Sequence, residues 1–371
     1  MHIGYSPIFQ NPGNALTDAE VYRKELHLAE LADPLGFDSI WSVEHHFTDY
    51  TMCPDPLQFL SYMTGRCPRL QVGTMVVVLP WHDPVRVAEQ ISMLDNLCGG
   101  QLILGLGRGL GRIEYEGFRI DMSEGRERFV EYAELVLEGL ERGYVEGGKT
   151  VQQPRRDLRP FPQRSFRGRT YAAAVSPESM PIMAKLGAGL LIIPQKPWEV
   201  VKQDFEVYTR VFHDINGMAP PPPFCGGFYF VDENADRAEE LARKYIGRYY
   251  HSVMQHYEMT ADHFGAAKGY EFYKNVGGYI DRHGTDGAAN DFVELMPWGT
   301  PEQVLEKLAY IHNVIGMNGM MCSFSYAGMP YDEAERNMRC FTSEVMPELR
   351  KWKTEPLAEP VPLQLESAAS A

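Results

Sequence analysis

Three groups of residues have the types and spacing to do chemistry, and each follows an apolar segment. They are Glu44-His45-His46, the glycine-flanked Arg108, and Ser176-Pro177-Glu178-Ser179. A histidine that titrates near neutral pH suits acid–base chemistry. A guanidinium beside a helix N-terminus suits an anion, and a phosphate above all. If the apolar segments are strands of one parallel barrel, these polar groups meet at its carboxyl end.

The histidine pair admits two kinds of site. Two histidines and a carboxylate at a strand end invite a metal ion, yet adjacent strand side chains point to opposite faces, so His45 and His46 do not easily reach one ion. The H-E-x-x-H helix pattern is also absent. We therefore predict no metal and expect one of the two histidines to face the carboxyl ends of the strands for acid–base chemistry. A histidine that is only hydrogen-bonded in place is the alternative, and the local pattern does not separate the two.

The glycine-rich turn around Arg108 does not fit a dinucleotide site. The pattern G-x-G-x-x-G fails on spacing, because its last position is Leu110 when counted from Gly105 and Arg112 when counted from Gly107. Two interpretations remain: an anion-binding Arg108, or a solvated arginine beside glycines that let a strand leave a barrel. Convergence with Ser176 and Ser179 from the next strand favours the anion.

Residues 71–111 show the repeating unit that positions these groups. Residues 72–79 form a nearly unbroken apolar run, typical of a strand covered on both faces. Asp83 and Pro84 then begin a helix, which ends at a glycine pair. A second apolar segment, residues 102–104, leads directly into the turn that carries Arg108. This unit is strand, helix, strand.

The same alternation runs through the chain and predicts a single (β/α)8 TIM barrel over residues 1–352. Residues 260–297 lack steady periodicity and are expected to form an insertion or mobile lid before strand 8. The tail, residues 353–371, is rich in Ala, Pro, Ser and Glu and is expected to be disordered. The expected strands are residues 3–6, 37–43, 72–79, 102–104, 169–175, 190–193, 224–231 and 317–324.

Composition excludes several classes of partner. There are 35 Lys and Arg against 50 Asp and Glu, a net charge of -15, so nucleic acid and anionic membranes are not expected as partners. No apolar run is long enough to cross a membrane, and no export signal opens the chain. The six cysteines are scattered without a C-x-x-C pair, as expected of reduced thiols in the cytoplasm.

Taken together, the motifs resemble the bacterial luciferase-like flavin monooxygenases, and their pattern is nearest to the α subunit of bacterial luciferase. The similarity spans roughly residues 2–352, and its combined order is more specific than any one motif. The start of that subunit's mobile loop is also similar to Lys268-Gly269-Tyr270. The motifs lie at residues 42–47, 72–74, 77–80, 82–86, 94–95, 105, 108–109, 299–302 and 345–347.

The resemblance implies that reduced FMN binds at the carboxyl ends of the strands. His45 would be the acid–base histidine, and the phosphate would lie at Arg108 and the turn of Ser176 and Ser179. Met75 and Val76 match a pair joined by a non-prolyl cis peptide beneath the flavin ring. The cofactor-binding residues expected from the resemblance are Met75, Val76, Leu106, Arg108, Val175, Ser176, Ser179 and Leu191.

The activity implied is that of a two-component monooxygenase. A separate NAD(P)H:flavin reductase would supply FMNH2, which would activate O2 as a C4a-peroxyflavin and oxygenate a small hydrophobic aldehyde, ketone or terpene-like substrate. A homodimer built on residues 55–67 and 84–98 is expected. Two alternatives stay open: a deazaflavin-dependent hydride-transfer enzyme, and a non-catalytic subunit of a luciferase-like heterodimer.

Three positions depart from the luciferase pattern. Gly107 replaces a cysteine beside the flavin, Val175 replaces a glutamate before the phosphate-binding serine, and Pro194 replaces a tryptophan of the pocket. These departures argue against light emission.

Overall fold

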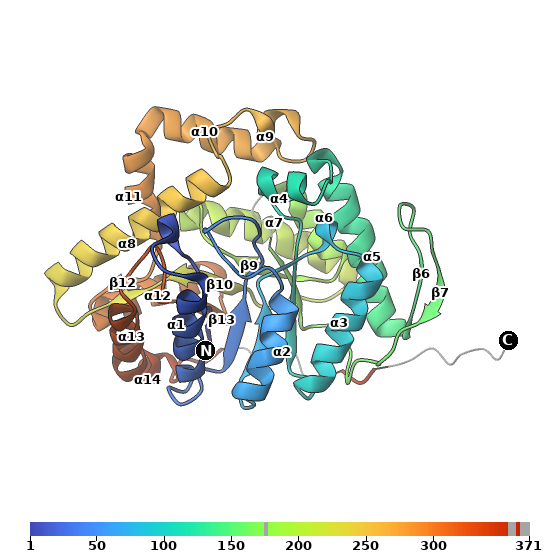
Figure 1. Cartoon of the computed structure of the whole chain (residues 1–371), viewed down its shortest axis with the longest axis horizontal. Coiled ribbons are helices and arrows are strands. Elements are labelled where there is room, and N and C mark those ends of the chain that lie inside the picture. Colours follow the sequence, from blue (N-terminus) through green and yellow to red (C-terminus); the bar gives the residue numbers. More distant parts are fainter. Residues whose placement is uncertain (174–176, 355–360, 364–371) are drawn as a thin grey trace.

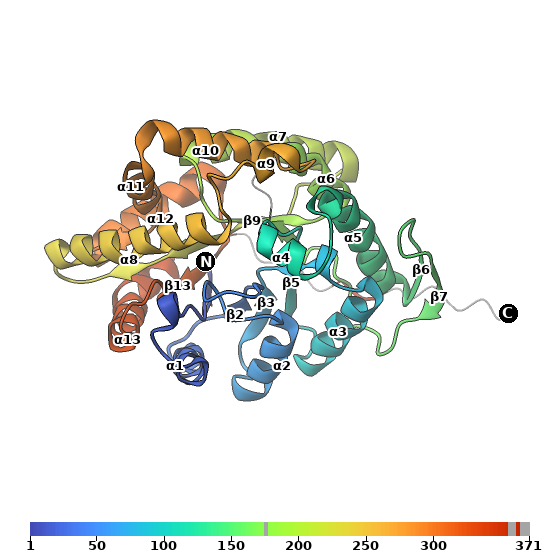
Figure 2. The same cartoon turned by 45° about the horizontal axis from the view of Figure 1, so that its top comes forward.

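A closed barrel of eight parallel strands forms the centre of the molecule (Figures 1 and 2). The computed structural model describes residues 1–173, 177–354 and 361–363. The barrel closes where the first strand pairs with the last, with His2 opposite Gly319. The TIM-barrel prediction is confirmed. In barrel order the strands are β1 (His2–Tyr5), β2 (Ser39–Ser42), β3 (Gln71–Thr74), β5 (Leu102–Gly107), β8 (Thr170–Ala173), β9 (Gly189–Ile192), β10 (Phe224–Phe228) and β13 (Gly319–Ser323).

Helices surround the barrel, and local signals set where several begin. Thr17 and Thr300 each form a capping box with the residue three positions on, and Asp83 accepts the N–H groups of Val85 and Arg86. Among the described residues no helix has the length and apolarity to cross a bilayer. The surrounding helices are α1 (Asp18–Leu31), α2 (Pro56–Arg66), α3 (Pro84–Leu97), α5 (Gly125–Arg142), α6 (Met180–Lys185), α7 (Trp198–Asn216), α8 (Ala235–His256), α12 (Pro301–Ile315), α13 (Tyr331–Cys340) and α14 (Met346–Leu349).

The third strand is shorter than its apolar run. β3 ends at Thr74, the peptide bond between Met75 and Val76 is cis, and β4 (Val77–Val78) then pairs separately with β5. The N–H of Val78 donates to the buried Glu44 carboxylate at 2.8 Å. Every residue of β3 after its first, and both residues of β4, are buried, so hydrophobicity gives no sign of the interruption.

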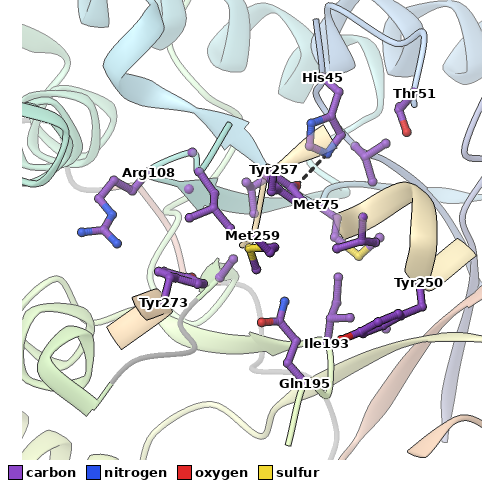
Figure 3. A pocket seen from close by; sticks show the side chains of 18 of the residues that line it. His45, Thr51, Met75, Arg108, Ile193, Gln195, Tyr250, Tyr257, Met259 and Tyr273 are labelled. Carbon is purple, nitrogen blue, oxygen red and sulfur yellow. Dashed lines mark hydrogen bonds between the residues drawn. The ribbon is translucent and has the colours of Figure 1, made fainter. Parts of the chain in front are cut away.

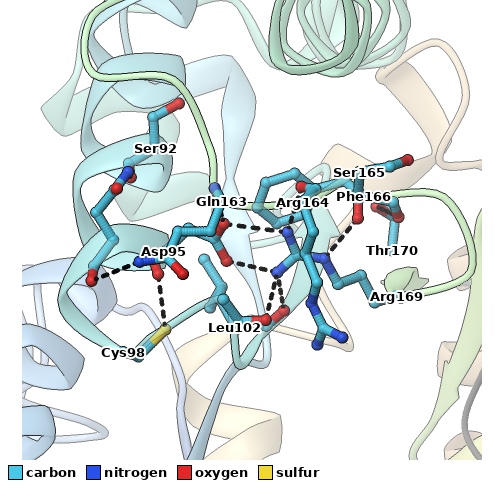
Figure 4. Close-up of polar contacts among 12 residues, drawn as sticks. Ser92, Asp95, Cys98, Leu102, Gln163, Arg164, Ser165, Phe166, Arg169 and Thr170 are labelled. Atoms are coloured by element: carbon cyan, nitrogen blue, oxygen red, sulfur yellow. Dashed lines mark hydrogen bonds and ion pairs between the residues drawn. The ribbon is translucent and has the colours of Figure 1, made fainter. Parts of the chain in front are cut away.

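Residues 147–169 are rich in Pro and Arg, a composition that predicts a loop with solvated arginines. The structure instead has a hairpin here, formed by β6 (Tyr144–Gly147), which ends where this segment begins, and β7 (Gln153–Asp157). Four of the five β7 residues are exposed, so the strand lacks the apolar alternation that would predict it. Arg169, at the end of this segment, is buried against α3. Its guanidinium makes two hydrogen bonds to Asp95, 2.5 and 3.2 Å long (Figure 4).

The segment expected to be an irregular insertion is helical. α9 (His263–Ala266), α10 (Glu271–His283) and α11 (Thr285–Leu295) follow α8 and cover the carboxyl end of the barrel, in orange at the top of Figure 1. Gly284, with φ of 73°, separates α10 from α11. In the C-terminal tail, the Ser165 N–H donates to Val361 O, while residues 355–360 and 364–371 lie outside the described residues.

Candidate functional site

A cavity of about 810 Å³ opens at the carboxyl ends of the strands, beneath α8, α10 and α11 (Figure 3). Residues that end or follow β2, β3, β5, β8, β9, β10 and β13 all contribute to its wall. This is where TIM-barrel enzymes bind their substrates. The cavity is therefore the candidate active site.

Five of the residues expected at a cofactor line this cavity: His45, Met75, Val76, Arg108 and Ser179. The Met75–Val76 bond is cis, as the sequence pattern implied.

Two other expected residues are buried without lining the cavity. Alternation along β5 turns Gly105 and Gly107 inward and Leu106 outward, into the apolar layer under the helices. Leu191 packs inside the barrel, below the cavity wall, where Ile193 is the lining residue instead. Val175 and Ser176 lie outside the described residues.

The two inward glycines of β5 allow other groups to approach closely. A Cβ on Gly105 would lie 2.0 Å from the carbonyl oxygen of Thr74, and a Cβ on Gly107 would lie 2.2 Å from Cγ2 of Val76. Val76 therefore occupies the space that a side chain at position 107 would need. This steric contact explains why position 107 holds a glycine where the luciferase pattern has a cysteine.

At one side of the cavity two guanidiniums converge on one carbonyl oxygen. Arg108 donates to Gly269 O at 2.7 Å, and Arg126, at the start of α5, donates to the same oxygen at 2.9 Å. Nε of Arg126 is buried with no hydrogen-bond partner, and no ion pair joins either arginine to a carboxylate among the described residues. Two positive charges thus share one neutral acceptor, and a phosphate would complement them.

On another side His45 contacts a buried carboxylate. Its Nδ1 donates to Glu114 Oε1 at 3.0 Å, and the backbone N–H of His46 donates to the same oxygen at 3.0 Å. Burial opposes ionisation of Glu114, but the imidazoles of His45 and His256 outweigh it and lower its pKa to about 2. Glu114 is therefore a carboxylate, and Nε2 of His45 faces the hydroxyl of Tyr257 at 3.3 Å (Figure 3).

His46 is hydrogen-bonded to a different carboxylate, that of Glu44. Buried Glu44 accepts hydrogen bonds from Nε2 of His46 at 3.1 Å, Nε2 of His82 at 2.5 Å and the Val78 N–H. Burial would raise the pKa of Glu44, yet these hydrogen bonds hold it below its usual value. His45 is thus hydrogen-bonded to Glu114 and His46 to Glu44. This agrees with the prediction that the two side chains point in different directions.

The group of His45, Glu114 and His256 has the composition of a divalent-metal site, with its ligand atoms all within 4.8 Å of one another. Each member already has a protein partner: Nδ1 of His45 is hydrogen-bonded to Glu114 at 3.0 Å, and Nδ1 of His256 is hydrogen-bonded to the Thr48 hydroxyl at 3.1 Å. Hydrogen bonding therefore accounts for the arrangement.

Sequence reasoning missed Glu114, Arg126, His256 and Tyr257. Arg126 and Glu114 follow the strand end that carries Arg108, so their position in the β5–α5 connection was the available signal. His256 and Tyr257 end a helix about 140 residues later, and no local pattern links them to His45.

Aromatic and aliphatic side chains form the rest of the wall. Phe228 of β10 and Tyr249 of α8 pack with ring centroids 3.7 Å apart and planes tilted by 33°, and Phe292 of α11 packs against Tyr250 with centroids 5.4 Å apart. Ile193 and Met254 add aliphatic surface. This part of the cavity suits an apolar guest.

Comparison with known proteins agrees with this geometry. Residues 1–317 match the family model described as luciferase-like monooxygenase. An alkanal monooxygenase alpha chain from Photorhabdus luminescens is 26% identical over 347 residues, covering 90% of this chain and 94% of that protein.

Two solved structures share the fold. Monooxygenase RslO1 from Streptomyces bottropensis has a TM-score of 0.73 at 24% identity, covering 94% of this chain and 100% of its own. The oxygenating constituent of 3,6-diketocamphane monooxygenase from Pseudomonas putida, a type II Baeyer-Villiger monooxygenase in complex with FMN, has a TM-score of 0.70 at 18% identity. It covers 94% of this chain and 99% of its own.

Proposed function

Because the chain belongs to the luciferase-like monooxygenase family, we propose that it uses reduced FMN and O2 to oxygenate a small hydrophobic substrate. One observation carries the proposal: a single cavity holds two arginines that form no ion pair with a carboxylate among the described residues, and a histidine hydrogen-bonded to a carboxylate. The first group suits the phosphate of a flavin nucleotide, and the second suits proton transfer at its ring.

The residues present fit FMN. Arg108 and Arg126 would hold the phosphate, together with Ser179 and the expected Val175 and Ser176. The orphaned Nε of Arg126 supports this assignment, because a buried guanidinium N–H without an acceptor is costly. Met75 and Val76 would lie against the flavin ring.

Bound reduced FMN would supply the electrons that activate O2. The chain would supply orientation, a proton site and exclusion of water. Since Nδ1 of His45 keeps its proton and donates it in a hydrogen bond to Glu114, Nε2 is the nitrogen that can accept or return a proton in the cavity. α10 and α11 would keep water from the site.

The aromatic wall supports an aldehyde, ketone or terpene-like substrate. A separate NAD(P)H:flavin reductase would provide FMNH2, since the glycine turn lacks the dinucleotide spacing. All six cysteines are free, which supports action in the cytoplasm. We further propose a homodimer through α2 and α3.

Anaerobic titration with photoreduced FMN tests the cofactor assignment. We expect Arg108→Ala and Arg126→Ala each to weaken binding at least tenfold, or about 1.4 kcal/mol, because each removes a charge from the phosphate. Arg155→Ala is the matched control, since Arg155 is exposed on β7 and stacks on Tyr144.

Mixing the reduced complex with O2 tests the activity. We expect the protein to change the rate of flavin reoxidation, and an accepted aldehyde or ketone to lower the yield of hydrogen peroxide as oxygen enters product. Binding of a deazaflavin in place of FMN would favour hydride transfer. Failure to bind either cofactor would favour a non-catalytic subunit.

A further inference from the structure

Glu114 is shared by two histidines that come from distant parts of the chain. Oε1 of Glu114 lies 3.0 Å from Nδ1 of His45 and 3.5 Å from Nε2 of His256, the last residue of α8. The His256 side chain is 1% exposed. A buried donor or acceptor without a partner would lower the stability of the fold here. It therefore matters which ring nitrogen of each histidine carries the proton.

The surroundings of His256 determine which of its nitrogens carries the proton. Its Nδ1 lies 3.1 Å from the hydroxyl of Thr48, and that oxygen already accepts the N–H of Tyr50 at 3.4 Å. The hydroxyl hydrogen is therefore available to donate to Nδ1, which leaves the proton of a neutral His256 on Nε2, facing Glu114. Tyr50 stacks on the ring at 4.4 Å and 14°, which holds its plane.

Burial lowers the pKa of His256, so it is a neutral donor at neutral pH. Oε1 of Glu114 accepts two hydrogen bonds, from the backbone N–H of His46 and from Nδ1 of His45. The N–H at Nε2 of His256 faces the same oxygen at 3.5 Å, which is an electrostatic contact longer than a hydrogen bond. The other titratable groups facing the cluster are Asp49, Tyr50, Tyr249, Tyr257 and Tyr273.

We propose that His256 is a positioning residue for His45: it holds the Glu114 carboxylate so that His45 keeps its proton on Nδ1 and presents Nε2 to the cavity. The role of His45 in catalysis rests on the proposed function, but the tautomer does not. His256 acts on the reaction only through Glu114.

Imidazole NMR of the full-length protein tests this directly. Histidine ring nitrogens are labelled with 15N, long-range 1H–15N spectra are recorded against pH, and His45→Asn assigns the His45 signals among the 11 histidines. We expect wild-type His45 to carry its proton on Nδ1 alone. In His256→Ala we expect a mixture of the two His45 tautomers, because Glu114 loses the N–H group that faces it and is held less firmly toward Nδ1 of His45.

Matched variants distinguish loss of the positioning role of His256 from a general disruption of the fold. His256→Gln keeps an N–H donor and should restore the wild-type tautomer of His45. Thr48→Val should leave the protein folded but give a mixture of the two tautomers of His256. His251→Ala is the control, since His251 is on the same helix but partly exposed.

Three results would overturn the proposal. One is an unchanged His45 tautomer in folded His256→Ala, and another is no rescue of that tautomer by His256→Gln. The third is a stoichiometric divalent metal in the purified protein that His256→Ala loses, which would make the cluster a metal centre. These NMR readouts need no flavin, so failure to bind FMN would count against the proposed function alone.

Discussion

At the residue scale, Glu25 shows how burial makes stability depend on pH. Its side chain lies on α1 with the residue 1% exposed, and the Ser325 hydroxyl donates to it at 2.7 Å. Burial raises its pKa to about 7, although the hydrogen bonds of Ser325 and Tyr331 oppose the shift. The folded state therefore binds this proton more tightly than the unfolded state, whose pKa is near 4.5. Stability from the neutral acid is complete below that value and is lost as pH rises through about 7.

Glu25→Gln removes this dependence while keeping an oxygen that can accept the Ser325 hydroxyl. Between pH 5 and pH 8, we expect the free energy of unfolding of the wild type to fall by about 2–3 kcal/mol relative to the variant. Urea unfolding at the two pH values measures the difference. If wild type and variant differ in their free energy of unfolding by the same amount at both pH values, the pKa of Glu25 is not raised.

At the scale of elements, a buried ion pair ties α3 to the segment before β8 (Figure 4). Asp95 of α3 accepts two hydrogen bonds from Arg169 and one from the Gln163 N–H. Arg169 also donates to the carbonyl of Leu102, at the start of β5. The pair therefore positions the neighbouring strands β5 and β8, whose far ends carry Arg108 and lead toward Ser179.

Asp95→Asn should lower the free energy of unfolding by about 3 kcal/mol, because it leaves a buried guanidinium without its counter-charge. Glu30→Gln is the matched control. Glu30 pairs with Arg66 at 2.7 Å on the surface between α1 and α2, where such pairs contribute less than about 1 kcal/mol. Similar losses in the two variants would contradict the role given to burial.

Elements with strong local signals were predictable. The eight strands follow apolar runs, and Thr17, Asp83 and Thr300 cap helices where their types indicate. The β6–β7 hairpin was missed because its side chains are solvated. The helices over the barrel were missed because glycines interrupt their periodicity.

The candidate site was predictable only where a residue follows its own strand. His45 and Arg108 could be nominated in this way, because strand ends meet at one edge. Glu114 and His256 contact His45 through the tertiary fold, which no local pattern reports. Leu106 was misplaced relative to the cavity because the direction of a side chain depends on the phase of β5.

At the scale of the whole molecule, α2 and α3 present an apolar surface to solvent. Tyr62, Met93 and Leu97 are 48%, 54% and 52% exposed, and Met93 and Leu97 lie one turn apart on α3. Exposed apolar side chains gathered on adjacent helices suit contact with a second copy of the chain.

Met93→Glu with Leu97→Glu should convert the proposed dimer to a monomer, since burial of these charges would be unfavourable. Sedimentation velocity measures the change. Met218→Glu is the control, because Met218 is 62% exposed just beyond α7, far in the sequence from this surface. A wild-type chain that sediments as a monomer would contradict the dimer.

The pairing of β1 with β13 has a consequence for synthesis on the ribosome. The first strand emerges early, but its neighbour at residues 319–323 is among the last parts made. At about 5–20 residues per second, roughly 15–60 seconds pass before the barrel can close. During that interval one edge of β1 has no neighbour, so the nascent chain is a natural client for chaperones that shield unpaired strands.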